Sequence, residues 1–197
     1  MNAPKKFYRK LPITPARIAY LENFVKDAPY GAIVECGVYM GWSAAVLINA
    51  CQGKRKVYLF DSYAGFPALS KSDVLPEYLR ISEGSHPNSV AKVEIFLKNL
   101  GLKLDNVKFI KGFFEDTVPE WAEKVGPIAL LHFDGDLYKG CRVVLKHLLP
   151  KVVEGGYFIS HDYPRFPAVK KAVEEFIDPN DILTSFVESG VYKKAAL

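Results

Sequence analysis

The sequence predicts an α/β fold with a doubly wound, mostly parallel sheet and a C-terminal antiparallel hairpin. Short apolar runs alternate along the chain with longer segments of helical period, which is the pattern of parallel strands joined by crossover helices. The apolar runs rarely alternate in polarity, as expected for strands covered on both faces. The last two segments meet at Ser189-Gly190 with no room for a helix between them, so we expect them to form a hairpin at the sheet edge.

The same patterns assign the individual elements in chain order. Strands are expected at residues 32–38, 56–62, 106–112, 127–134 and 155–162. Helices are expected at residues 43–51, 89–101, part of 115–125, 139–152 and 167–177, and the hairpin strands at 182–189 and 190–197. Residues 68–88 carry Pro, Gly and Ser without a clear period, so they form either a mobile lid over the site or a long surface loop.

Length and composition suit one globular domain over residues 1–197, because 49% of the residues are hydrophobic and 24% are charged. The net charge of +4 is spread along the chain apart from KKFYRK at residues 5–10, which argues against a nucleic-acid partner. No stretch approaches the roughly 20 apolar residues of a membrane helix, and no apolar signal segment opens the chain.

The cysteines indicate a reducing compartment. Cys36, Cys51 and Cys141 lie far apart and form no CxxC pair, as is typical of reduced core thiols. We therefore expect a cytoplasmic protein with no membrane partner. The terminal hairpin offers an edge through which a homo-oligomer can pair.

Acidic residues gather at the carboxyl ends of the expected strands, where open α/β sheets bind their ligands. Glu35, Asp61, Asp134 and Asp162 each end a strand, and Glu115 closely follows the remaining one. A shared polar site explains this pattern better than chance placement of acids on the surface does.

The first strand-to-helix turn, ECGVYMGWS at residues 35–43, favours a nucleoside ligand. Gly37 allows the backbone to approach a ligand closely, and Ser43 is placed to cap the following helix. The turn is not GxGxxG, so it matches a dinucleotide site poorly. Asp61, about 25 residues downstream, stands where an acid commonly accepts hydrogen bonds from a ribose. S-adenosylmethionine fits, because it lacks a pyrophosphate and its cationic sulfonium suits nearby acids.

A second group, Asp134, His161 and Asp162, follows two strands that we expect to be neighbours. Carboxylate and imidazole ligands without a thiolate suit Mg²⁺ or Mn²⁺ when carboxylates dominate. The structural alternative is that Asp162 caps the helix that begins near Pro164 and that His161 is a satisfied buried imidazole.

Five stretches, VECGVYMGWSA, YLFDSYAGFP, KGFFEDTVP, FDGDLY and GGYFISHDY, resemble the macrocin O-methyltransferase (TylF-like) family in order and spacing, from about residue 16 to 192. The resemblance implies a Rossmann-like class I methyltransferase that uses S-adenosylmethionine and Mg²⁺. It also implies that the acceptor is a small-molecule hydroxyl, such as that of a sugar or other natural product. The identity of the acceptor does not carry over.

The resemblance further implies the roles of individual residues. The residues that would hold the methionine end of the cofactor are Glu35, Gly37, Val38, Tyr39 and Ser43. Asp61 and Ser62 would hold the ribose, Gly112 and Phe113 would lie near the adenine, and Asp134 would be the first metal ligand. Family members usually carry two adjacent aspartates where this chain has His161-Asp162, which makes a softer and less anionic site. The alternatives to Mg²⁺ are therefore Mn²⁺, another metal ion or a mechanism without a metal.

Three mechanisms follow from these assignments. In the first, a metal held by Asp134, His161 and Asp162 binds the acceptor hydroxyl, and Asp136, directed into the pocket by Gly135, is the general base. In the second, no metal is bound, and His161 takes the proton while Asp162 orients it. In the third, the chain is a nucleotide-binding module that transfers no methyl group. The missing GxGxxG motif and the paired acids argue against this third alternative.

Overall fold

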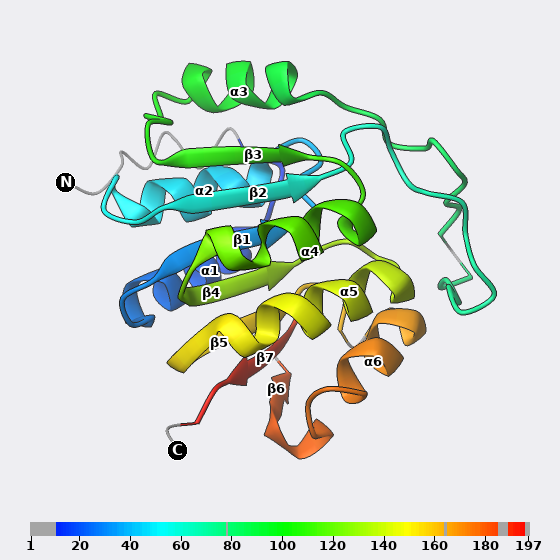
Figure 1. Ribbon diagram of the computed structural model, residues 1–197. Coiled ribbons are helices and arrows are strands. Elements are labelled where there is room, and N and C mark those ends of the chain that lie inside the picture. Colours follow the sequence, from blue (N-terminus) through cyan, green and yellow to red (C-terminus); the bar gives the residue numbers. More distant parts are fainter. Residues whose placement is uncertain (1–10, 78, 164, 185–188, 196–197) are drawn as a thin grey trace.

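A seven-stranded sheet in the order β3-β2-β1-β4-β5-β7-β6 crosses the molecule (Figure 1). The computed structural model describes residues 11–77, 79–163, 165–184 and 189–195. The strands are β1 (Ala32–Cys36), β2 (Val57–Asp61), β3 (Val107–Lys111), β4 (Ile128–Phe133), β5 (Val152–Ser160), β6 (Ile182–Thr184) and β7 (Gly190–Lys193). β1 to β5 pair in parallel, whereas β7 runs antiparallel to both β5 and β6. The predicted fold class is confirmed.

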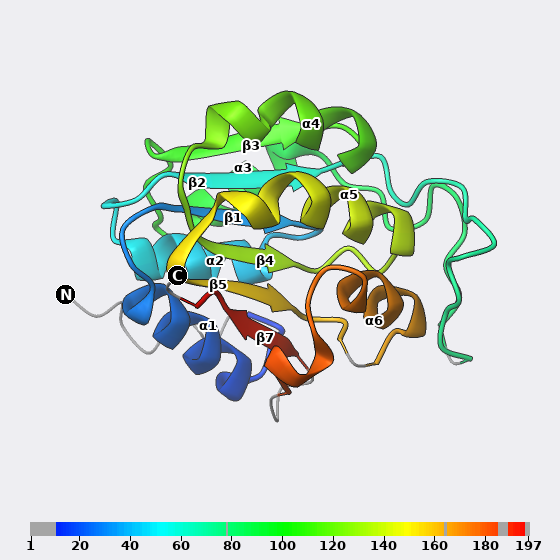
Figure 2. The same ribbon diagram turned by 60° about the horizontal axis from the view of Figure 1, so that its bottom comes forward.

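Helices cover both faces of the sheet (Figures 1 and 2). They are α1 (Pro15–Asp27), α2 (Trp42–Cys51), α3 (Val90–Asn99), α4 (Phe114–Val125), α5 (Tyr138–Leu148) and α6 (Pro167–Glu174), with single 3₁₀ turns η2 (Leu149–Lys151) and η3 (Pro179–Asp181). The core formed with α1, α2 and α3 contains Ile33 and Leu59, and the core formed with α4, α5 and α6 contains Val34 and Phe60. Successive residues of one strand are therefore buried in opposite layers, which explains why the apolar runs do not alternate in polarity.

Helix α1 was not predicted, although its sequence carries a recognisable start. The side chain of Thr14 accepts a hydrogen bond from the backbone N–H of Arg17 at 3.2 Å, and Pro15 opens the first turn. Ile18, Leu21 and Val25 recur at helical spacing and are buried in the core on the α2 side. The Thr14-Pro15 pair, followed by apolar residues at helical spacing, is the signal that predicts this helix.

Several boundaries differ from the predicted ones. α5 ends at Leu148, and the turn η2, which contains Pro150, leads into β5 at Val152 rather than at residue 155. The hairpin is present as predicted, with β7 between β5 and the edge strand β6. Residues 185–188 and 196–197 of its predicted strands lie outside the described residues. None of the helices in the described part of the chain is long and apolar enough to cross a membrane.

Candidate active site

A cavity of about 580 Å³ opens where β1, β2, β3 and β4 end. The predicted site residues that line it are Gly37, Val38, Tyr39, Ser43, Asp61, Ser62, Phe113, Asp134 and Asp136. Glu35, Gly112, His161 and Asp162 do not line it. The structure thus brings most of the predicted residues to one hollow at the edge of the sheet where ligands are expected.

The turn after β1 passes directly against the end of β4. Gly37 has φ +97°, and a Cβ built there would lie 2.0 Å from the carbonyl oxygen of Asp134. The backbone N–H of Asp134 donates to the carbonyl of Cys36 at 2.9 Å, which locks the two strand ends together. A glycine is therefore required where the predicted cofactor turn meets the acidic segment.

Ser43 does not cap α2, contrary to the prediction. The N-cap is Gly41, with φ +82° and no side chain to accept a hydrogen bond, and the helix begins at Trp42. Ser43 is buried in the first helical turn and lines the cavity. Its predicted contact with the cofactor stays a prediction.

Asp61 organises the backbone around the cavity. Its Oδ2 accepts hydrogen bonds from the N–H groups of Val38 at 2.8 Å and Tyr39 at 2.9 Å, and its Oδ1 accepts one from Tyr63 at 2.7 Å. The carboxylate at the end of β2 therefore holds the turn that follows β1. Its predicted bond to a ribose stays a prediction, and in that role it would share oxygens already engaged with the backbone.

We expect Asp61→Asn to lower the free energy of unfolding by about 1–3 kcal/mol and to weaken S-adenosylhomocysteine binding as well. The amide keeps one acceptor oxygen but places an NH₂ group against backbone N–H donors, so at least one of them loses its partner. Urea denaturation and calorimetry measure the two effects. The control is Asp105→Asn, at an exposed position outside the cavity. Weaker binding with unchanged stability would instead indicate that the backbone hydrogen bonds of Asp61 add little to stability and that its contact with the cofactor dominates.

Glu35 lies within β1 and does not line the cavity. Its side chain has no exposed surface, and its Oε1 is 3.0 Å from Nδ1 of His132 on the neighbouring strand β4. Its Oε2 is buried and has no hydrogen-bond partner among the described residues. The role of Glu35 at the methionine end of the cofactor stays a prediction, and His132 is a buried residue within β4.

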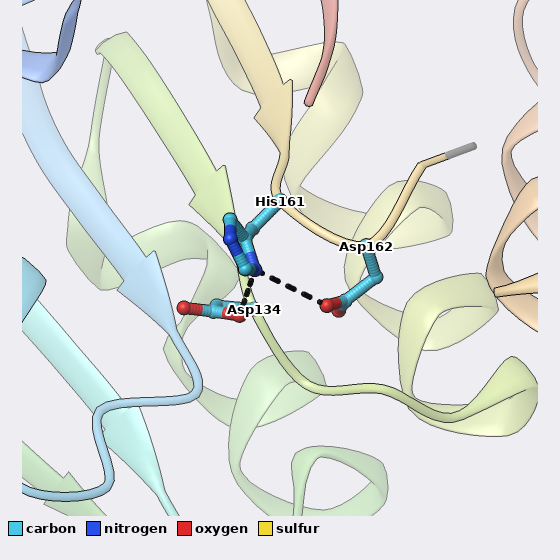
Figure 3. Close-up of side chains that lie close together, drawn as sticks. All are labelled: Asp134, His161 and Asp162. Carbon is cyan, nitrogen blue, oxygen red and sulfur yellow. Dashed lines mark ion pairs between the residues drawn. The ribbon is translucent and has the colours of Figure 1, made fainter. Parts of the chain in front are cut away.

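Asp134, His161 and Asp162 lie together at the ends of β4 and β5 (Figure 3). His161 Nδ1 is 2.9 Å from Asp134 Oδ1 and 3.4 Å from Asp162 Oδ1. Nδ1 is buried and not aligned for a hydrogen bond with either carboxylate. One ligand atom from each of the three residues lies within 4.8 Å of the others, so the predicted metal-ligand set is assembled.

The charges of this cluster are strongly coupled. Burial alone would raise the pKa of Asp134, but the charges of His161 and Arg17 hold it well below its usual range. Burial would lower the pKa of His161, but the carboxylate of Asp134 raises it to about 9. Burial also raises the pKa of Asp162. At neutral pH, Asp134 is thus an anion beside a His161 cation.

Asp136 has an unusual backbone conformation for a residue other than glycine. Its φ is +61°, and its backbone N–H donates to Asp162 Oδ2 at 3.0 Å. The aspartate lines the cavity, and burial together with the charges of Asp162 and Asp134 raises the pKa of its carboxyl group well above the usual range. Non-glycine residues held in such conformations cluster at functional sites.

The structural alternative for Asp162 is wrong in one respect. α6 begins at Pro167 with Phe166 as N-cap, so the Asp162 side chain does not cap that helix. Its carboxylate instead accepts the Asp136 N–H and faces His161.

The described residues of the segment 68–88 form a long irregular loop beyond the carboxyl ends of the strands (Figure 1). Leu79, Ile81 and His86 line the cavity from this segment. Asp73, which was not predicted as a site residue, ties the segment to the start of α5 because its Oδ1 accepts the N–H of Tyr138 at 2.8 Å. Whether the segment opens and closes stays a prediction.

Arg17 is the other functional residue that the sequence did not reveal. Its Nη2 donates to Asp134 Oδ2 at 2.6 Å, and its side chain lines the cavity. The two residues are 117 positions apart, and no pattern in the sequence links them.

The fold places the chain among the methyltransferases. It is similar to the solved structure of the O-methyltransferase NovP, with 27% identity and a TM-score of 0.79 over 91% of this chain and 80% of that one. The sequence model of the macrocin-O-methyltransferase (TylF) family matches residues 16–192, and the chain belongs to this family. It is therefore an O-methyltransferase, and S-adenosylmethionine is its methyl donor.

Two relatives have described reactions. The chain is 32% identical to the mycinamicin III 3''-O-methyltransferase of Micromonospora griseorubida, over 87% of this chain and 71% of that protein. It is 31% identical to the 8-demethyl-8-(2,3-dimethoxy-alpha-L-rhamnosyl)-tetracenomycin-C 4'-O-methyltransferase of Streptomyces olivaceus, over 79% of this chain and 61% of that protein.

Proposed function

We propose that the chain transfers the methyl group of S-adenosylmethionine to a hydroxyl of a small molecule of the sugar or natural-product type. The names of the two relatives support this acceptor class. The observation that carries the proposal is the contact between the Gly37 turn, expected to hold the cofactor, and the segment Asp134-Gly135-Asp136. This contact supports a site in which two carboxylates lie close to the methyl donor.

The reaction requires an in-line displacement. The acceptor oxygen attacks the methyl carbon, the bond from that carbon to sulfur breaks, and the sulfur keeps the electron pair to give S-adenosylhomocysteine. Alignment of oxygen, carbon and sulfur by the cavity walls is worth roughly 7–11 kcal/mol. In this proposal the hydroxyl proton passes to the carboxylate of Asp136, whose backbone is held in place by Asp162. The carboxyl group must first lose its own proton, and its raised pKa then makes the carboxylate a stronger base.

The residues present fit a divalent metal ion. The distances of 2.9 and 3.4 Å from His161 Nδ1 to the two carboxylate oxygens are close to the spacing of about 3.0 Å between neighbouring ligands at bond lengths of about 2.1 Å. Nδ1 of His161 is buried and makes no hydrogen bond among the described residues. Its lone pair would be available to an ion once the imidazole has lost its proton. Asp134, His161 and Asp162 would hold the ion. When bound, it would supply positive charge that lowers the pKa of the acceptor hydroxyl. One imidazole among carboxylates favours Mn²⁺ over Mg²⁺.

The cofactor is tested by calorimetric titration of the purified protein with S-adenosylhomocysteine, with NAD⁺ as the control ligand. We expect micromolar binding of the first and no binding of the second. If S-adenosylhomocysteine did not bind, methyl transfer would be excluded for this chain, and a different ligand would have to account for the acids at the strand ends.

Metal removal tests the metal-assisted version. We expect dialysis against EDTA to remove most of the turnover with an acceptor found by screening glycosides and phenols, and Mn²⁺ to restore it. Turnover that survives EDTA would favour the metal-free mechanism. In that case His161→Gln should abolish transfer, because the proton would then pass to the imidazole.

A further inference from the structure

Arg17 links helix α1 to the carboxylate at the end of β4. Its Nη2 is 2.6 Å from Asp134 Oδ2, and the two side chains are only 16% and 24% exposed. The residue stands in the first turn of α1, which is held against the core through Ile18 and Leu21. The guanidinium is therefore a fixed part of the cavity wall rather than a mobile surface charge.

The two oxygens of Asp134 face different partners. Oδ2 is taken by Arg17, whereas Oδ1 lies 2.9 Å from His161 Nδ1. Asp162 Oδ1 lies on the His161 side, 3.4 Å from the same nitrogen. An ion held by Asp134, His161 and Asp162 would thus meet one oxygen of Asp134, with a permanent positive charge bound to the other.

This arrangement opposes tight metal binding. An arginine stays protonated in proteins, so its charge cannot be removed when an ion arrives. Repulsion between like charges a few ångströms apart is strong where water is partly excluded. The pair with Arg17 also neutralises part of the anionic charge that would attract a divalent cation.

We propose that Arg17 is a positioning residue that presents Asp134 to the metal through Oδ1 alone and keeps the affinity of the site for divalent cations low. The proposal rests on the metal-assisted version of the proposed function. It predicts that loss of the arginine charge strengthens metal binding, which is the opposite of what loss of a merely structural contact would do.

The experiment is a Mn²⁺ titration followed by electron paramagnetic resonance of the free ion, without acceptor or turnover. We expect Arg17→Gln and Arg17→Met to bind Mn²⁺ at least about tenfold more tightly than the unsubstituted protein. Arg17→Lys, which keeps the charge, should stay within about threefold. The matched control is Arg142→Gln, at a 51% exposed residue paired with Glu175 outside the cavity lining, and it should bind as the unsubstituted protein does.

Two outcomes would overturn the inference. In one, the uncharged variants keep their affinity for S-adenosylhomocysteine but bind Mn²⁺ no more tightly than the unsubstituted protein does. In the other, no variant binds Mn²⁺ at all, and the metal-assisted version of the function then fails with it. The proposed methyl donor would stand in both cases, because it is tested separately by the S-adenosylhomocysteine titration.

Discussion

Asp136→Asn should lower turnover by about 10²–10⁴-fold and leave the affinity for S-adenosylhomocysteine unchanged. The amide has the size of the carboxylate but cannot accept the hydroxyl proton. Asparagine also tolerates a positive φ, so the backbone at +61° and its N–H bond to Asp162 should be kept. Single-turnover rates with a screened acceptor, together with calorimetry, separate the chemical step from binding.

The control for this prediction is Asp105→Asn, the same chemical change at an exposed residue outside the cavity. It should leave turnover within about twofold, as is usual for surface substitutions. Wild-type turnover in Asp136→Asn would remove Asp136 as the base. A loss of both turnover and cofactor affinity would instead indicate that the substitution disturbs the cavity as a whole.

Gly37→Ala should weaken S-adenosylhomocysteine binding by about 100-fold or more, which corresponds to about 3 kcal/mol. The added methyl would lie 2.0 Å from the carbonyl oxygen of Asp134, and both atoms belong to rigid strand ends. The turn after β1 must therefore move away from β4. The φ of +97° adds about 1–3 kcal/mol of strain to the folded state, so the midpoint of urea unfolding should fall as well.

Gly53→Ala is the matched control for backbone strain. Gly53 has φ +71°, and nothing lies within 4 Å of the position of an added Cβ. We expect a loss of stability of about 1–2 kcal/mol from the backbone alone, with unchanged cofactor affinity. Equal losses of affinity in the two variants would mean that general destabilisation, and not the closeness of β1 and β4, explains the result at Gly37.

The parallel strands could be predicted because each is a short apolar run buried on both faces. Ile33 and Val34 are neighbours in β1, and both are fully buried, each in a different layer of the core. Consecutive residues of such a strand are therefore all apolar, which makes the strand recognisable in the sequence. Helix α1 was missed although Thr14 and Pro15 mark its start. The end of α5 was placed too late, because the apolar residues continue through the 3₁₀ turn at Pro150 into β5.

The sequence by itself determined the order of strands and helices, the edge of the sheet where the site lies and the residue types that meet there. These follow from local hydrophobic period and from the rule that parallel strands carry their ligands at one end. Only the tertiary structure decided where each side chain points and what it contacts. In that structure Glu35 is buried against His132, and Asp61 accepts hydrogen bonds from the backbone of the neighbouring turn. Arg17 donates a hydrogen bond to Asp134. Contacts across 117 positions depend on how whole layers pack, and no local pattern encodes them.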